Sequence, residues 1–169
     1  GVKNYSILVS HVRVPPAMHA ILGSPLNRVQ GFLAAGHVCA VMGYWEYPPI
    51  ASQYRVPIVV TGFEPVDILQ GISMAVKQLE NGQCEVQNGY PRIVTMAGNR
   101  TAQAMIEKVL QPCDRMWRGI GLIPQSGWEL RPEFSEFDAE KRFDVGHIQT
   151  RESQVCIAGQ ILQGLKKPA

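Results

Sequence analysis

Two short turns in this sequence hold the side chains best suited to chemistry. In the first, the run AGHVC places His37 directly after Gly36. In the second, the run GFEPVD places Glu64 and Asp67 on either side of the point where a proline favours the start of a helix. An imidazole and two carboxylates can serve as general acids and bases or as metal ligands. These turns are therefore the candidate functional site.

The position of each turn in the chain suggests that the two share a crevice. Each turn follows a strand-like run, and open α/β sheets bind ligands at the carboxyl ends of their strands. Glu64 would then project into a cleft shared with His37, joined by the Cys39 thiol if the turn brings both groups to one face. Spacing alone favours simpler roles, namely a structural histidine and carboxylates that complement the positive end of a helix dipole.

The four cysteines do not predict a metal site by themselves. Cys39, Cys84, Cys113 and Cys156 form no C-x-x-C pair, and none has a histidine at zinc-finger spacing. Disulfides are not expected, because a chain of this size builds enough core without them.

Composition excludes several classes of protein. The hydrophobic fraction of 46% and the charged fraction of 18% are typical of a soluble globular chain. The net charge is +2 and the basic residues are scattered, so neither nucleic acid nor an anionic membrane is an expected partner. No apolar run approaches the roughly 20 residues that span a bilayer. Glycine-rich nucleotide-binding and G-x-S-x-G hydrolase motifs are absent, and the short G-I-G at 119–121 does not replace them.

The strand and helix around the second turn are the clearest elements. The β-branched run at 56–61 predicts a strand buried on both faces, with Pro57 near its first residue because proline cannot donate to a sheet. A helix is expected to begin at or beside Pro65 and to end at the Asn-Gly pair at 81–82. Its apolar residues recur at helical spacing and predict one buried stripe: Ile68, Leu69, Ile72, Ala75, Val76 and Leu79.

The remaining pattern alternates strands and helices, which predicts an α/β fold with an open, mostly parallel sheet and flanking helices. Expected strands lie at 5–9, 30–34, 92–96 and 119–123. Expected helices lie at 17–22, 39–42 (a short apolar helix or turn), 100–110 (with Asn99 as its N-cap), 134–143 (a charged helix or turn) and 152–165.

Four blocks of this sequence together resemble one known family. They are AAGHV at 34–38, VTGFEPVDILQ at 60–70, WRGIG at 117–121 and FDAE at 137–140. Their order and intervals are similar to those of the HypD family of nickel–iron hydrogenase maturation proteins, over nearly the whole chain. The GFEP block is the most specific of the four.

This resemblance implies a fold, partners and cofactors. It implies a HypD-like α/β domain with a deep cleft at 1–150, and the start of a truncated iron–sulfur region at 151–169. HypD proteins are cytoplasmic scaffolds and redox participants, not turnover enzymes. They carry a 4Fe–4S cluster and work with HypC and HypE to assemble the Fe(CN)2CO centre of the hydrogenase large subunit, which is reached through HypC.

The resemblance also carries roles onto particular residues. Those matching the cleft and iron-assembly blocks are Gly36, His37, Gly62, Phe63, Glu64 and Asp67. Cys156, in the run CIAG, matches the first of the family's cluster-binding cysteines, and thiolates are the usual cluster ligands. The chain departs from the family at Ala35, where proline is usual, and at Cys39, where serine is common.

The chain is expected to be an internal fragment. The family's G-P-G-C-P-V-C block would precede Gly1, and the other cluster cysteines would follow Ala169. The chain alone is therefore expected to hold no stable 4Fe–4S cluster, because a cluster normally takes four thiolates. Two other interpretations remain open: a small-molecule enzyme that uses a His37/Glu64 crevice, and a purely structural domain in which Glu64→Ala costs about 0.5–2 kcal/mol as a lost helix cap.

Overall fold

The computed structural model describes residues 2–145, 147–149, 151, 153 and 155–167 of the chain. The chain forms two compact units. One consists of Ile21–Ala104, and the other joins Gly1–Ala20 to Met105–Ala169. Two helices, α1 (Val14–Leu22) and α5 (Arg100–Val109), contain the points where the chain passes from one unit to the other.

A three-stranded parallel sheet forms the centre of the Ile21–Ala104 unit. Its strands are β1 (Phe32–Ala35), β2 (Ile58–Thr61) and β3 (Val86–Asn88), in that order. All four residues of β2 are buried, as the β-branched run predicts for a central strand. Pro57 lies just before β2, and its carbonyl accepts a hydrogen bond from the backbone N–H of Phe32 at 2.9 Å.

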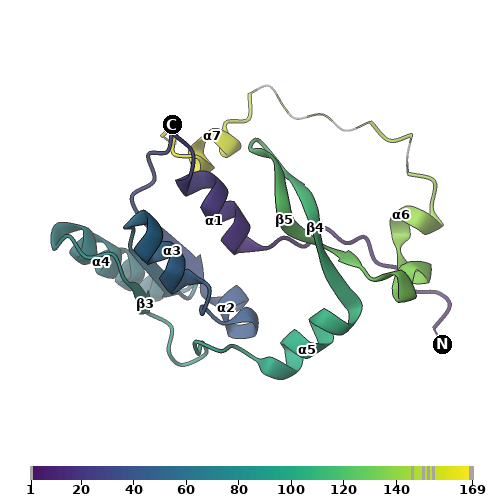
Figure 1. Ribbon diagram of the computed structural model, residues 1–169, viewed down its shortest axis with the longest axis horizontal. Helices are drawn as coiled ribbons and strands as arrows, with labels where there is room; N and C mark the ends of the chain where they lie inside the picture. The colour runs from purple at the N-terminus through teal and green to yellow at the C-terminus, as the bar shows by residue number, and fades with distance from the viewer. Residues whose placement is uncertain (1, 146, 150, 152, 154, 168–169) are drawn as a thin grey trace. The chain divides into compact units, whose positions relative to one another are not determined.

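Three helices of this unit surround the sheet (Figure 1): α2 (Gly36–Met42), α3 (Tyr47–Tyr54) and α4 (Pro65–Glu80). Helix α4 packs on β1 and β2, α2 contacts the same two strands, and α3 contacts β3. Helix α3 was not expected from the sequence pattern. It has proline in its first turn and ends at Arg55, which has a left-handed conformation with φ of 54°. The fully buried side chains of this unit include Ile50, Ile58, Val59, Val60 and Val94.

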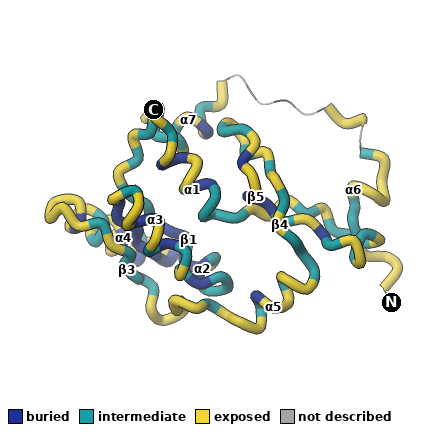
Figure 2. Tube along the Cα trace, viewed as in Figure 1, coloured by how far each residue is buried: buried dark blue, intermediate teal, exposed yellow. Residues whose placement is uncertain are grey.

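Helix α4 presents the opposite face to the sheet from the one that its apolar pattern predicts. Its buried residues are Asp67, Gly71 and Gln78, whereas Leu69, Ile72, Val76 and Leu79 of the predicted stripe are exposed. Much of the trace of α4 is accordingly coloured as exposed in Figure 2. A Cβ at Gly71 would lie 3.0 Å from Thr61 Oγ1, so the missing side chain lets the helix approach β2 closely. The prediction of a buried apolar stripe is therefore wrong.

An antiparallel hairpin forms the centre of the other unit. Strands β4 (Leu110–Trp117) and β5 (Gly121–Leu130) pair with an irregularity between Cys113 and Arg115. Ser126 is fully buried, accepting a hydrogen bond from Trp117 Nε1 at 2.8 Å and donating to the Ile123 carbonyl at 2.7 Å. Short helices follow the hairpin: η1 (Pro132–Phe137), α6 (Ala139–Arg142) and α7 (Ala158–Leu162).

The predicted α/β fold class is confirmed, as an open parallel sheet with flanking helices and a small antiparallel hairpin. The helices predicted at 17–22, from Pro65 and after Asn99 are confirmed as α1, α4 and α5, and Asn99 Oδ1 accepts from the backbone N–H of Ala102 at 3.1 Å. The charged stretch at 134–143 falls in η1 and α6.

Several predicted elements differ from the structure. Residues 5–9 form a single bridge, at Ile7, instead of a strand. Residues 92–96 lie in turns, and the strand is β3, which precedes them. The short strand at 119–123 belongs to the longer β5, whose partner β4 was not predicted. The last helix is shorter than 152–165, and residues 152 and 154 of that range lie outside the described residues.

The predicted domain boundary near residue 150 stays a prediction. Among the described residues, no helix combines the length and the apolar character needed to cross a bilayer.

Candidate functional site

The two turns that carry the candidate side chains lie at one edge of the parallel sheet. Strand β1 ends at Ala35 and β2 ends at Thr61, and these two residues are paired in register. The chain leaves β1 at Gly36 to begin α2, and leaves β2 at Gly62 to begin α4 shortly afterwards. Because both strands run in the same direction, the turns emerge side by side, as open α/β sheets place their ligand-binding loops.

An aromatic contact joins the first turn to the second. The rings of His37 and Phe63 lie with their centroids 4.8 Å apart and their planes inclined at 45°. Both side chains are exposed, so the imidazole remains open to solvent on its other side. No hydrogen bond joins His37 to Glu64 within the described part of the chain.

Cys39 does not take part in this site. Its side chain is fully buried in α2, and its Sγ donates to the hydroxyl oxygen of Tyr47 at 3.8 Å. Burial raises the pKa of the Cys39 thiol, which keeps it protonated and unreactive near neutral pH. The sequence left open whether the turn brings Cys39 and His37 to one face, and in the structure it does not.

Asp67 is held by an arginine that the sequence analysis did not select. Arg92 donates from Nη1 to Asp67 Oδ1 at 2.9 Å and from Nη2 to Oδ2 at 2.5 Å, which is the paired geometry of a strong charge-assisted contact. Nη2 also lies 3.4 Å from Glu64 Oε2. The Arg92 guanidinium, and to a lesser extent a hydrogen bond to Glu64, hold the pKa of the Asp67 carboxyl below its usual range. Asp67 is thus a buried anchor held in its charged form near neutral pH, whereas Glu64 is largely exposed.

The side chain of Glu64 does not cap α4. Glu64 is the N-cap residue by backbone position, yet its carboxylate accepts no capping hydrogen bond from the backbone N–H groups of the first turn and instead pairs with Arg92. Asp67 lies in that first turn, where the helix dipole favours an anion. The interpretation of Glu64 as a helix cap is not supported by this geometry.

Tyr90 lies over the glycines of both turns. A Cβ at Gly36 would lie 2.7 Å from the Tyr90 ring, and one at Gly62 would lie 2.8 Å from it. The Arg92 guanidinium stacks on the same ring, with its carbon 4.3 Å from the ring centroid. The two glycines therefore provide the space for an aromatic ring, and that ring supports the arginine that holds Asp67.

Sequence reasoning missed Tyr90 and Arg92 because it placed a strand at 92–96. The available signal was the Asn-Gly pair at 88–89, which marks a turn. In the structure Asn88 Oδ1 accepts from the backbone N–H of Tyr90 at 2.9 Å, and Asn88 Nδ2 donates to the Val94 carbonyl at 2.9 Å. A turn at this point would have placed Tyr90 and Arg92 after a third parallel strand, at the same sheet edge as the other candidate residues.

Cys156, the candidate cluster ligand, belongs to the other unit and is exposed just before α7. The nearby Gly159 packs against Gly119 in the β4–β5 turn so closely that a Cβ on either would meet the other's backbone. Gln163 Nε2 also donates to the Gly119 carbonyl at 2.8 Å. Two of the blocks noted in the sequence, WRGIG and CIAG, are therefore in direct contact.

The cysteines of this chain do not fit a 4Fe–4S cluster by themselves. Such a cluster needs four thiolates around one centre. Cys39 is buried against Tyr47, and the described residues contain no group of three or more cysteine, histidine or acidic side chains arranged to hold a metal.

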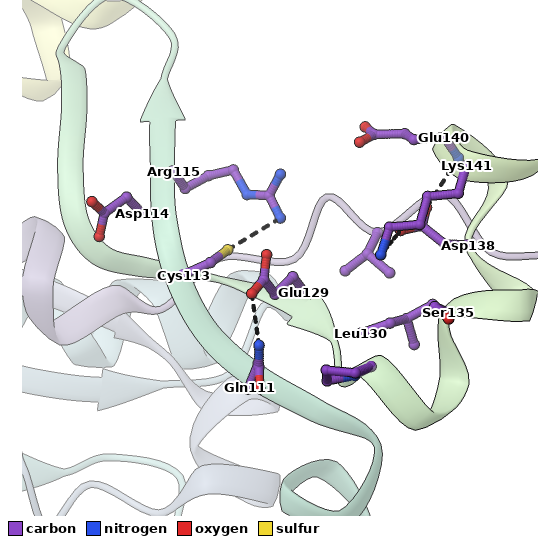
Figure 3. Close-up of a pocket in the computed structure, with 12 residues that line it drawn as sticks. Gln111, Cys113, Asp114, Arg115, Glu129, Leu130, Ser135, Asp138, Glu140 and Lys141 are labelled. Atoms are coloured by element: carbon purple, nitrogen blue, oxygen red, sulfur yellow. Dashed lines mark hydrogen bonds and ion pairs between the residues drawn. The ribbon is translucent and has the colours of Figure 1, made fainter. Parts of the chain in front are cut away.

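A pocket of about 450 Å³ lies beside the hairpin and the η1–α6 segment (Figure 3). Its charged groups largely satisfy one another: Gln111 Nε2 donates to Glu129 Oε1 at 2.8 Å, and Lys141 Nζ lies 3.7 Å from Asp138 Oδ2. Burial raises the pKa of the Cys113 thiol that lines this pocket. These properties give the pocket no evident reactive group.

The fold and the sheet-edge cluster define an open α/β protein whose polar side chains gather where parallel strands end. The family model described as "HypD: Hydrogenase formation hypA family" matches residues 1–169. The chain therefore belongs to the HypD family.

Its relatives carry names from hydrogenase formation. The chain is 42% identical over 174 residues to the hydrogenase expression/formation protein HupD of Azotobacter chroococcum, and 41% identical over 174 residues to the hydrogenase maturation factor HypD of Azotobacter vinelandii. It is 39% identical over 170 residues to HypD of Escherichia coli K12. Each alignment covers 99% of this chain but only 45% or 46% of the relative, so the chain spans about half the length of these proteins.

Proposed function

We propose that this chain supplies one wall of the cleft in which a HypD protein assembles the iron centre of a nickel–iron hydrogenase. The observation that carries the proposal is the meeting of the AGHV and GFEP blocks at one sheet edge, where the rings of His37 and Phe63 are in contact and Asp67 is fixed by Arg92. The iron, with its cyanide and carbon monoxide ligands, is the cargo of the protein in this proposal and not its resident cofactor.

In this proposal the side chains at the sheet edge have different roles, because their environments differ. Asp67 is already saturated by Arg92, so it acts as an anchor that holds the turn in place. His37 and Glu64 are exposed and available to an incoming ion, an imidazole nitrogen and a carboxylate oxygen both being good ligands for iron. In the proposed function these two residues contact the cargo, and Asp67, Tyr90 and Arg92 position them.

A 4Fe–4S cluster and the partners HypC and HypE belong to the proposed function of the full-length protein. Cys156 would supply one thiolate to the cluster, with the others coming from outside this chain. The Gly119–Gly159 contact would fix the segment that carries Cys156 on the hairpin. Transfer to the hydrogenase large subunit would proceed through HypC, in the cytoplasm, with the protein acting as a scaffold and not as a turnover enzyme.

The test uses a full-length relative, such as that of Azotobacter vinelandii, changed at the positions aligned with this chain. Substitution to alanine at the His37 position, and to glutamine at the Glu64 position, is expected to abolish or strongly reduce hydrogenase activity in cells that lack their own HypD. Ser52→Ala, on an exposed position of α3, is the matched control and is expected to leave maturation intact. Normal maturation with both site variants, present at normal protein levels, would contradict the proposal.

A further inference from the structure

Helix α4 carries an apolar stripe that faces away from the sheet it packs on. Five side chains at intervals of three and four residues form this stripe, and they are 43% to 73% exposed: Val66, Leu69, Ile72, Val76 and Leu79. At about 100° per residue they project within an arc of roughly 140°. The buried residues Asp67, Gly71 and Gln78 lie on the opposite side of the helix.

This arrangement is unusual for a helix on the surface of a globular protein, which normally turns its apolar side to the core. The inward face is fixed by specific contacts. Gly71 lies against Thr61, the Thr61 hydroxyl donates to the Asp67 carbonyl at 2.7 Å, and Gln78 Oε1 accepts from the backbone N–H of Glu85 at 2.8 Å. The helix therefore cannot rotate to bury the stripe without breaking the Asp67–Arg92 pair as well. Contiguous exposed apolar patches are often functional, and this one is held outward by the contacts just described.

We propose that, in full-length HypD proteins, this α4 stripe is covered by the part of the polypeptide that lies outside the region matched by this chain. That part amounts to more than half of each relative, since the chain spans only 45% or 46% of their length. The occupant is expected to present an apolar face of its own, because the five side chains that form the stripe are all apolar.

The size of the stripe favours an occupant on the same polypeptide over a second copy. Helix α4 has 16 residues and is thus about 24 Å long, and a stripe roughly 10 Å wide along it presents roughly 240 Å². A stable association between separate proteins buries about 800 Å² on each partner. A small apolar contact suffices within one polypeptide, because the covalent connection gives the two surfaces an effective concentration in the millimolar range.

The stripe begins at the candidate site, since Val66 lies between Glu64 and Asp67 in the GFEPVD run. The covering segment would therefore also border the sheet edge. The covering of the stripe is independent of the iron chemistry: it holds whether or not His37 and Glu64 have a role in maturation.

Hydroxyl-radical footprinting tests the proposal directly. The oxidation rates of Leu69 and Val76 are measured in this 169-residue chain, and those of the aligned residues in the purified full-length Azotobacter vinelandii relative without partners. We expect rapid oxidation in the chain and several-fold slower oxidation in the full-length protein. Equal oxidation in both proteins would overturn the proposal. Protection that depends on chain concentration would assign the stripe to a second copy, and protection in the full-length protein only after HypC is added would assign it to a partner; either result would also overturn it.

A substitution gives an independent readout. Leu69→Glu is expected to leave the thermal midpoint of the 169-residue chain unchanged and to lower its binding of an apolar dye. At the aligned position of the full-length relative the same change is expected to lower the midpoint clearly. Gln70→Glu, on the neighbouring exposed residue, is the matched control and should do neither. A loss of stability with Leu69→Glu in the chain itself would show that the stripe is already covered there, and would contradict the proposal.

Discussion

At the edge of the parallel sheet and at the turn of the hairpin, the chain holds family blocks together by different physical means. The sheet edge relies on charge and stacking, with Arg92 clamping Asp67 and resting on the Tyr90 ring. The hairpin turn relies on shape, because Gly119 and Gly159 bring two backbones closer than any side chain would allow. The first arrangement leaves polar groups exposed beside a fixed anchor, which suits a site that handles an ion. The second leaves no space and suits a structural attachment for the segment that bears Cys156.

The largest loss of stability is expected at Gly36, a glycine of the sheet edge that is closely packed against both backbone and the Tyr90 ring. A Cβ at Gly36 would lie 2.5 Å from the Thr61 carbonyl oxygen and 2.7 Å from the Tyr90 ring. Because one of these neighbours is backbone, Gly36→Ala is expected to lower the free energy of unfolding by about 3 kcal/mol, measured by urea denaturation. Gly82→Ala is the control: it has a positive φ but nothing within 4 Å, and should cost about 1 kcal/mol. Equal losses of unfolding free energy in Gly36→Ala and Gly82→Ala would refute the steric role assigned to Gly36.

The next largest effect on stability is expected at the hairpin turn. Gly159→Ala places a methyl group against the backbone of Gly119 and is expected to destabilise the attachment of α7 by about 2 kcal/mol. The measurement is hydrogen exchange of the amides at 157–165, which should accelerate while exchange in the Ile21–Ala104 unit stays the same. Ala158→Ser, at an exposed neighbouring position, should leave all of these rates unchanged. Unaltered exchange in Gly159→Ala would remove the steric role of this glycine pair.

A pH titration distinguishes the charge-based region from the shape-based one. The folded pKa of Asp67 is lowered, so its stabilising effect is fully present above the unfolded value near 3.9 and is lost as the pH falls through the folded value. Asp67→Asn is expected to be less stable than the parent near neutral pH and to lose less stability between about pH 5 and pH 2. Glu80→Gln, an exposed carboxylate on the same helix, is the control. If the stability of Asp67→Asn and that of the parent changed in parallel with pH, the stabilising role of the Asp67–Arg92 pair would be contradicted.

The smallest effect on stability is expected at Glu64. Its carboxylate lies 3.4 Å from Arg92 and both side chains are more than half exposed, so the pair is screened by solvent. Glu64→Gln should therefore leave the urea midpoint almost unchanged while it impairs maturation in a full-length relative. A clear loss of stability would instead assign Glu64 a structural role.

The sequence was most informative where a local pattern coincides with the contacts of the fold. The run at 56–61, the proline at 65 and the shared sheet edge of His37 and Glu64 follow from β-branching, φ restriction and the direction of parallel strands. The apolar pattern of α4 gave a wrong face, because Gly71 and the Asp67–Arg92 pair decide which side approaches the sheet. Periodicity shows that a helix has an apolar side, but not whether the matching surface lies in the same chain.

Arg92 could not be found from local spacing, because it lies 25 positions from Asp67 and meets it only after a third strand is formed. The same limit applies to the hairpin. Strand β4 contains a proline, and its polar and apolar residue types alternate only weakly, so the strand depends on its pairing with β5. Contacts between Gly119 and Gly159 likewise depend on a return of the chain across many residues.

The most direct test of the central proposal is the infrared spectrum of a purified full-length relative bound to HypC, in the region where iron-bound cyanide and carbon monoxide absorb. With the residue aligned to His37 changed to alanine, we predict that these bands disappear or weaken strongly, while the complex with HypC still forms. Bands of normal intensity and frequency in that variant would show that the sheet edge described here does not hold the iron.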